Sequence, residues 1–225
     1  SFAPAYHQKA EALTAMERFG DALDVHRETL MLDAPQPSTF CYMGECLEHL
    51  GDFDEAEQYY MQCLDLDANF LEAHVGLGVL DDLRQDHDAA LEHFAQALLL
   101  HPHHEDTLLM MAIVLKKMKR HEDADMCLVQ ILERNPKHLE AWEERIDNMQ
   151  ALEAHDQALI LLDNAFEHMP PTSTSLRYKK FVSLFALRMD GEALRLLDQL
   201  LIADFEGMNR LLETYPGLLD DPRVA

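Results

Sequence analysis

The chain has 225 residues, 48% of them hydrophobic and 8% aromatic, which is typical of a folded protein and too apolar for a disordered one. It carries 42 acidic against 18 basic residues, a formal net charge of −24 that repels nucleic-acid phosphates and anionic lipid. Nucleic acid and membrane are therefore disfavoured as partners. The charge either attracts a basic segment of a partner protein or simply keeps a helical surface soluble. With 8 glycines, 9 prolines and many Ala, Leu, Glu and Met residues, the composition predicts an all-α protein.

One segment recurs along the chain. Its first copy is "RFGDALDVHRETL" (18–30), and later copies begin at residues 52, 85, 119, 153 and 188. The copies align on an anchor alanine that recurs every 34 residues, with the last copy one residue late. The anchors are Ala22, Ala56, Ala90, Ala124, Ala158 and Ala193. Such a period predicts an array of stacked helical units.

A second repeating segment precedes the anchor segment, as in 40–52, 74–86, 108–120 and 142–154. Its apolar residues recur at three- and four-residue spacing, which indicates an amphipathic helix. Each unit is therefore predicted to be helix A, a short turn, helix B and another short turn. Small residues such as Gly44, Gly78 and Ala112 are expected where the two helices approach closely, with larger ones such as Tyr60 and Phe94 between them.

This pattern resembles the tetratricopeptide (TPR) family, most closely in residues 37–70. That stretch carries Phe40, Met43, Gly44, Leu47, Gly51, Phe53, Ala56, Tyr60 and Cys63 in register, and the family's turn proline follows later as Pro102, Pro136 and Pro170. The resemblance implies a right-handed α-solenoid, a superhelix of about six TPR units. The units are expected at 3–36, 37–70, 71–104, 105–138, 139–172 and 173–205.

A capping helix is expected at about 205–214, covering the last apolar face of a single array over residues 1–225. The closing segment also resembles the C-terminal part of long bacterial TPR-array proteins of unknown function. Together with Ser1 as the first residue and a direct entry into helix A, this suggests a fragment of a longer chain.

In the TPR family helix A lines the inner groove, so the resemblance places a candidate peptide groove on the helix A positions. The apolar middle could bind a partner or be buried by neighbouring helices, and the acidic run of the fifth repeat could be a solvated face. The candidates are Tyr42, Glu45, Val75, Val79, Leu109, Met110, Ile113, Glu143, Glu144, Asp147, Tyr178 and Lys179, beside His7, Gln8, Glu11, Cys41, Glu48, Gly76 and Val182. The lysine, arginine and asparagine positions that bind a C-terminal carboxylate in chaperone-binding TPR domains are not matched here.

Catalytic and cofactor motifs are not found in the sequence, and neither an enzyme nor a cofactor is expected. The stretch "HPHHED" (101–106) is a candidate metal site, but the repeat register places it between two repeats, so adventitious metal binding is the only metal role left open. His87, His121 and His155 recur in the A–B turn where earlier repeats have Phe19 and Phe53, which predicts a packing role. The four cysteines lack metal or disulfide spacing and are expected as reduced, partly buried thiols.

The sequence thus predicts a non-catalytic scaffold that binds a peptide or helix of a partner protein, basic or amphipathic, in the groove. The alternative is a structural segment that self-associates or packs on upstream repeats, with no peptide in this groove. No apolar run approaches the roughly 18 residues that cross a bilayer, so membrane insertion is not expected and a cytoplasmic location is favoured.

Overall fold

The structure, a computed structural model, describes residues 3–32 and 34–203, and this part of the chain forms twelve α-helices and no strand. The helices are α1 (Ala3–Ala15), α2 (Phe19–Leu32), α3 (Pro37–Leu50), α4 (Phe53–Leu66), α5 (Leu71–Leu83), α6 (His87–Leu100), α7 (Glu105–Lys117), α8 (His121–Arg134), α9 (Leu139–Ala151), α10 (His155–His168), α11 (Thr174–Ala186) and α12 (Asp190–Ala203). The predicted all-α fold of paired helices is confirmed. The capping helix predicted at about 205–214 lies outside the described residues.

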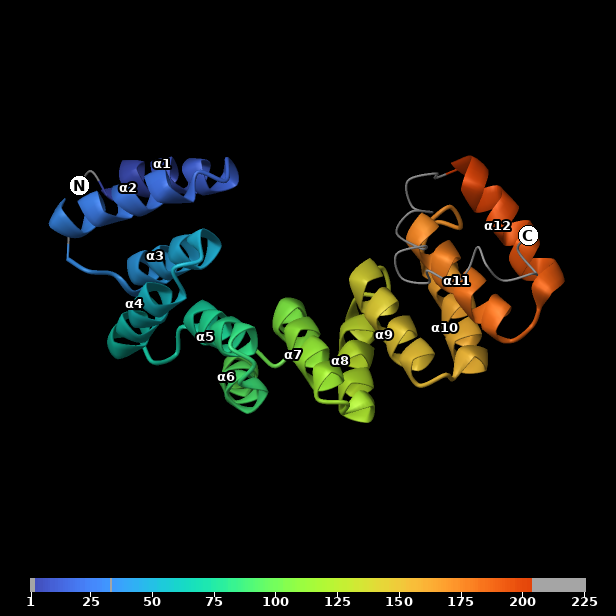
Figure 1. Cartoon of the computed structure of the whole chain (residues 1–225). Coiled ribbons are helices and arrows are strands. Elements are labelled where there is room, and N and C mark those ends of the chain that lie inside the picture. The colour runs from blue at the N-terminus through green and yellow to red at the C-terminus, as the bar shows by residue number, and fades with distance from the viewer. Residues whose placement is uncertain (1–2, 33, 204–225) are drawn as a thin grey trace. The chain divides into compact units, whose positions relative to one another are not determined.

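The chain divides into two compact units, unit 1 at residues 1–119 and unit 2 at residues 120–225. Within unit 1, which holds α1 to α7, each helix packs against the next along the chain, and the helices in the A position also touch, α3 on α5 and α5 on α7. Unit 2 repeats this scheme from α8 to α12, with α9 also contacting α11 (Figure 1). Contacts confined to near neighbours along the chain are typical of stacked helical repeats.

Each turn between helix A and helix B has one residue with a positive φ. In the second repeat it is Gly51, with φ 84°, and the other five turns have a non-glycine residue with φ between 57° and 65°. These are Glu17, Gln85, Lys119, Glu153 and Arg188. At Gly51, its N–H donates to the Glu48 carbonyl (3.0 Å) and the next N–H donates to the Leu47 carbonyl (2.9 Å), which closes the C-terminal end of helix A.

The packing of helix A on helix B depends on glycines, which have no side chain. A Cβ added at Gly44 would lie 2.7 Å from Tyr60 Cε1, and one added at Gly76 would lie 2.4 Å from Tyr60 Cζ. The Tyr60 ring therefore lies between α3 and α5 in the space that two glycines leave, and its hydroxyl donates to Glu48 Oε2 at 2.9 Å. Gly78 leaves the same kind of space for Phe94. The predicted role of Gly44 and Gly78 is confirmed, whereas Gly76, expected to line the groove, serves the core instead.

Ion pairs join neighbouring helix pairs in unit 1. Arg84, directly after α5, reaches back to α4, where it pairs with Glu57 at 2.7 Å and with Asp54 at 2.8 Å. Lys117 on α7 pairs with Asp82 on α5 at 2.5 Å. Because these side chains are partly exposed, each pair contributes about 1 kcal/mol or less.

Candidate functional site

The helix A surface of unit 1 carries seven of the predicted groove residues. Tyr42 and Glu45 lie on α3, Val75 and Val79 on α5, and Leu109, Met110 and Ile113 on α7. Tyr42 is 39% exposed, whereas Leu109 is only 7% exposed and offers little surface to a partner. The other five are half-buried. Cys41 and Gly76, which belong to the same set of helix A positions, are buried.

The apolar middle of this surface is continuous with the core. Val75, Val79 and Met110 pack against a buried cluster formed by Ala90, Phe94 and Val114. Both interpretations that the sequence leaves open therefore describe part of the arrangement. The side chains support the core with one side, and the half-buried remainder is accessible from outside.

The helix A surface of unit 2 carries the other five predicted residues, all half-buried. Glu143, Glu144 and Asp147 lie on α9, and Tyr178 and Lys179 lie on α11. Asp147 and Lys179 form an ion pair across these two helices.

A second link between α9 and α11 lies beside this ion pair. Gln150 Nε2 donates to the Lys179 carbonyl at 2.7 Å and to Ser183 Oγ at 2.8 Å. The acidic run is therefore not a purely solvated face, because one of its carboxylates helps to hold two A helices together.

A cavity of about 330 Å³ opens among α1, α2 and α3 in unit 1. It brings together the predicted Tyr42 and Glu45 with five further residues. The full lining is His7, Glu11, Thr14, Ala15, His26, Tyr42 and Glu45. The cavity has two carboxylates, and none of the described residues that line it is a lysine or arginine.

His26 is the buried member of this lining. Its side chain comes from α2 and is 3% exposed, and its Nδ1 has no hydrogen-bond partner. The ring stacks on Tyr42 with 5.6 Å between centroids and lies 6.2 Å from the ring of His7. Burial, and next the charge of His7, lowers the pKa of His26 to about 4, so the ring is neutral at pH 7.

The acidic residues around Tyr42 affect the pKa of its hydroxyl. Burial raises the pKa of Tyr42, and the negative charge of Glu11 raises it further, followed by Cys41, Glu45 and Glu72. The position of Glu11, His7, Tyr42 and Glu45 on A helices made them groove candidates in the sequence. His26 follows its anchor Ala22 by four residues, as Tyr60 and Phe94 follow theirs, so the repeat register held a signal for it that was missed because the residue is polar.

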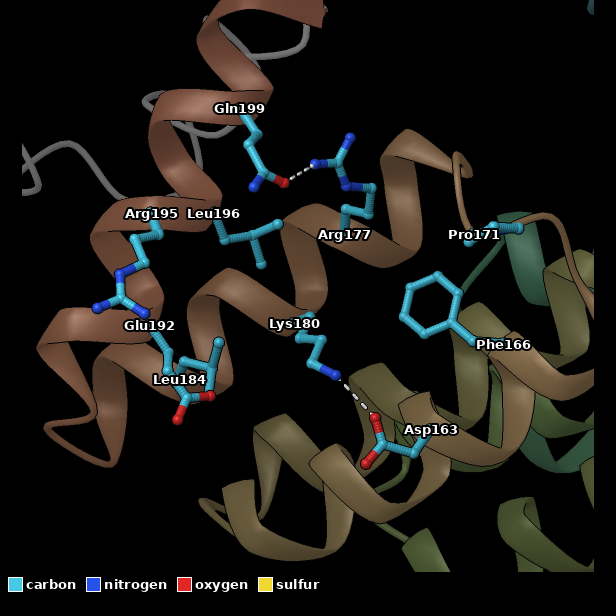
Figure 2. A pocket seen from close by; sticks show the side chains of 10 residues that line it. All are labelled: Asp163, Phe166, Pro171, Arg177, Lys180, Leu184, Glu192, Arg195, Leu196 and Gln199. Atoms are coloured by element: carbon cyan, nitrogen blue, oxygen red, sulfur yellow. Dashed lines mark hydrogen bonds and ion pairs between the residues drawn. The ribbon is translucent and has the colours of Figure 1, made fainter.

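A larger cavity of about 500 Å³ lies among α10, α11 and α12 of unit 2 (Figure 2). Lys180 points to Asp163 and pairs with it at 2.7 Å, and its Nζ lies 5.8 Å from the centre of the Phe166 ring. Arg177 donates to Gln199 at 2.7 Å. The remaining lining residues are Pro171, Leu184, Glu192, Arg195 and Leu196. Lys180 and Arg177 thus already have partners within the cavity (Figure 2). Since the lining also mixes acidic and basic residues, it does not indicate one kind of ligand.

The histidines of the repeats have local structural partners. His121 Nδ1 lies 2.6 Å from Asn148 Oδ1, and Asn148 Nδ2 donates to the His121 carbonyl at 2.9 Å, so this histidine makes polar contacts as well as packing. In "HPHHED", His104 Nδ1 accepts the N–H of Thr107 at 3.3 Å and caps α7, as His138 caps α9 by accepting the N–H of Ala141 at 3.2 Å. Histidine is an uncommon residue at this position, and the sequence alone did not indicate the caps.

The described residues also show how the chain stands with respect to metal-binding groups, cysteines and membrane-spanning helices. In the part of the chain that the structure describes, no group of three or more His, Cys, Asp or Glu residues is placed to hold a metal ion. All four cysteines are buried and free of disulfides. None of the described helices has the length and apolar character needed to cross a bilayer.

Solved structures similar to this chain are TPR proteins and other helical relatives. A tetratricopeptide repeat protein from Parabacteroides merdae has a TM-score of 0.71 at 14% identity, with 89% of this chain and 79% of that chain covered. For pilF of Pseudomonas aeruginosa the TM-score is 0.75 at 14% identity, covering 97% and 94%. YrrB, described as a TPR protein with an unusual peptide-binding site, has a TM-score of 0.65 at 20% identity, covering 86% and 98%. At these identities the likeness shows the fold.

The sequence itself identifies the family. No curated protein matches it. Residues 44–162, more than half of the chain, match the family model described as the Cilia and flagella-associated protein 70 middle TPR-like domain. This stretch contains the close match to the TPR pattern at Gly44, Gly51, Ala56 and Tyr60 and the repeats that follow it. The chain therefore belongs to the family of the Cilia and flagella-associated protein 70 middle TPR-like domain, a branch of the tetratricopeptide repeats.

Proposed function

We propose that this chain is a non-catalytic protein-interaction scaffold that binds an amphipathic, basic segment of a partner protein on its helix A surface. The TPR fold is generally that of interaction scaffolds, and one similar structure, YrrB, is described by its peptide-binding site. The observation that carries the proposal is the surface of unit 1, where half-buried apolar side chains of α5 and α7 follow an exposed tyrosine and a carboxylate of α3. An amphipathic segment with basic residues matches this order of chemistry.

The charge of the chain supports the basic character of the partner. With 42 acidic and 18 basic residues, the chain attracts cationic segments over a distance of about 8–10 Å at physiological salt. Steering of this kind raises the association rate more than it raises the affinity. The apolar residues Val79 and Ile113 are then expected to determine how long the segment stays bound.

The test is a selection of random peptides displayed on phage against the full chain, followed by affinity measurements with the selected peptides. The Val79→Glu/Ile113→Glu variant should lose binding at least tenfold. Since Val79 also supports the core, the Val79→Thr/Ile113→Thr variant, which is isosteric at position 79 and one heavy atom smaller at position 113, should show a smaller loss while keeping its circular dichroism spectrum.

The matched control is Met61→Glu/Leu99→Glu, two exposed apolar residues on the B helices α4 and α6 of unit 1, which should leave affinity unchanged. Failure to select any peptide, or equal affinities for the groove and control variants, would instead favour a structural segment that packs on further repeats. Sedimentation of this chain beside a longer version would then show whether it associates with itself.

A further inference from the structure

The cavity among α1, α2 and α3 is a hollowed and acidic part of the helix A surface. Its two carboxylates, Glu11 and Glu45, come from different helices and share the cavity with the exposed ring of Tyr42. At about 330 Å³ the cavity is at the small end of ligand pockets, a size suited to one side chain.

The floor of the cavity has an unsatisfied polar group. His26 is almost fully buried, and its Nδ1 finds no hydrogen-bond partner among the described residues. Four other buried side-chain atoms of the described residues also lack a hydrogen-bond partner, and this nitrogen is shielded from the cavity itself. His26 therefore contributes a neutral ring that backs Tyr42, with 5.6 Å between the two centroids.

We propose that this cavity holds an arginine side chain of the partner segment, with its guanidinium paired to the carboxylates of Glu11 and Glu45 and stacked on the ring of Tyr42. The inference rests on the proposed function, since it names the anchor of the segment that the helix A surface binds. A guanidinium combines the three features that the cavity requires. It is cationic, it is planar and stacks on aromatic rings, and it carries several N–H donors, which can bond to both carboxylates.

The charges around the cavity agree with a cationic occupant. The residues that shift the pKa of Tyr42 include three carboxylates, those of Glu11, Glu45 and Glu72. The other histidine of the lining, His7, is the only described lining residue that can become cationic besides His26. A carboxylate ligand would meet repulsion from Glu11 and Glu45, and an apolar side chain would leave both carboxylates without a partner.

A direct test uses Nα-acetyl-arginine methylamide as the probe and Nα-acetyl-citrulline methylamide as its uncharged, isosteric control. Each is titrated at millimolar concentration into the full chain while NMR follows the ring signals of His26 and Tyr42, assigned with the His26→Phe and Tyr42→Phe variants. The arginine probe should shift both signals and the citrulline probe should not. Glu45→Gln should weaken the arginine response by about fivefold, as expected for the loss of one half-buried charge pair, whereas Glu143→Gln in unit 2 should leave it unchanged.

A second arm uses the peptides selected for the proposed function. Replacing the arginine of a selected peptide by citrulline should weaken binding at least fivefold to the unmodified chain and have less effect on the Glu11→Gln/Glu45→Gln variant. If peptides bind through Val79 and Ile113 but tolerate citrulline, the arginine anchor is wrong and the proposed function stands. If no peptide is selected, the proposed function fails, and the amide titration still decides the cavity. Equal responses to both amides, or none, overturn the inference.

Discussion

The two glycines that face Tyr60 allow a sharp test of how this fold is packed. In Gly76→Ala the new Cβ would lie 2.4 Å from Tyr60 Cζ, about 1 Å closer than an ordinary carbon contact. The ring cannot simply retreat, because it already lies so close to Gly44 of α3 that a Cβ added there would be 2.7 Å from it, and its hydroxyl is bonded to Glu48. Helix α5 must therefore move away from α4.

The expected magnitude is the difference of two effects. Overpacking in a close-packed core costs about 1–3 kcal/mol, and the confined ring places this site near the upper end. Replacing glycine by alanine inside a helix returns about 1 kcal/mol through helix propensity. We therefore expect Gly76→Ala to lower the free energy of unfolding by about 2 kcal/mol.

The measurement is urea unfolding of the full chain followed by circular dichroism at 222 nm. The single tryptophan, Trp142, lies in unit 2, so its fluorescence reports on that unit separately. Gly20→Ala and Gly191→Ala are the controls, since an added Cβ at either position meets nothing within 4 Å, and both should be neutral or slightly stabilising. In a Tyr60→Leu background, Gly76→Ala should lose most of its cost, because the ring it collides with is gone. A Gly76→Ala variant as stable as Gly20→Ala would refute the reasoning.

Three further predictions concern single side chains. His26 has a pKa lowered to about 4 in the folded chain, so the unfolded chain binds the proton more readily, and stability should fall by about 2 kcal/mol between pH 7.5 and 5; in urea titrations His26→Phe should remove this part of the pH dependence, and an unchanged dependence would contradict it. Asn148→Leu leaves polar groups of His121 without partners and should cost unit 2 about 2 kcal/mol in tryptophan-detected unfolding, whereas Asn164→Leu on the surface should cost little. Gln85→Gly removes the strain of a positive φ, so it should stabilise the chain by about 0.5–1 kcal/mol and raise the midpoint temperature of thermal unfolding. A lowered midpoint would show that the turn holds glutamine without strain.

Much of the fold could be predicted because it repeats. Alanines such as Ala56 and Ala90 recur every 34 residues, so the helix positions could be predicted even where one helix boundary was ambiguous. Each of these anchors lies fully buried in its B helix. The pairing of a small residue at Gly44 with a large one at Tyr60 could also be predicted, since it recurs as Gly78 with Phe94 and Ala112 with Leu128. The array boundaries and the single continuous array remain predictions.

The candidate site was harder to predict, because periodicity gives the face of a helix but not the depth of a side chain. Val75 and Leu109 occupy the same position of the repeat, yet Leu109 is buried and Val75 is half-buried. The ring contacts of His26, with His7 in its own repeat and with Tyr42 in the next, were visible only in the structure. The caps made by His104 and His138 were missed for a different reason, since histidine seldom has this role.

The positive-φ turns have a consequence for how such a chain can diverge. Their path is held by main-chain hydrogen bonds, such as those from the N–H groups of Glu153 and Ala154 to carbonyls of α9, at 3.0 and 2.9 Å. The side chain at the turn is therefore free to vary at a modest cost, and this chain places Glu17, Gly51 and Lys119 at the same point of the repeat. Mutation there can reverse the local charge without redirecting the backbone. The backbone path of the repeat and the charge on its surface can therefore change independently of each other.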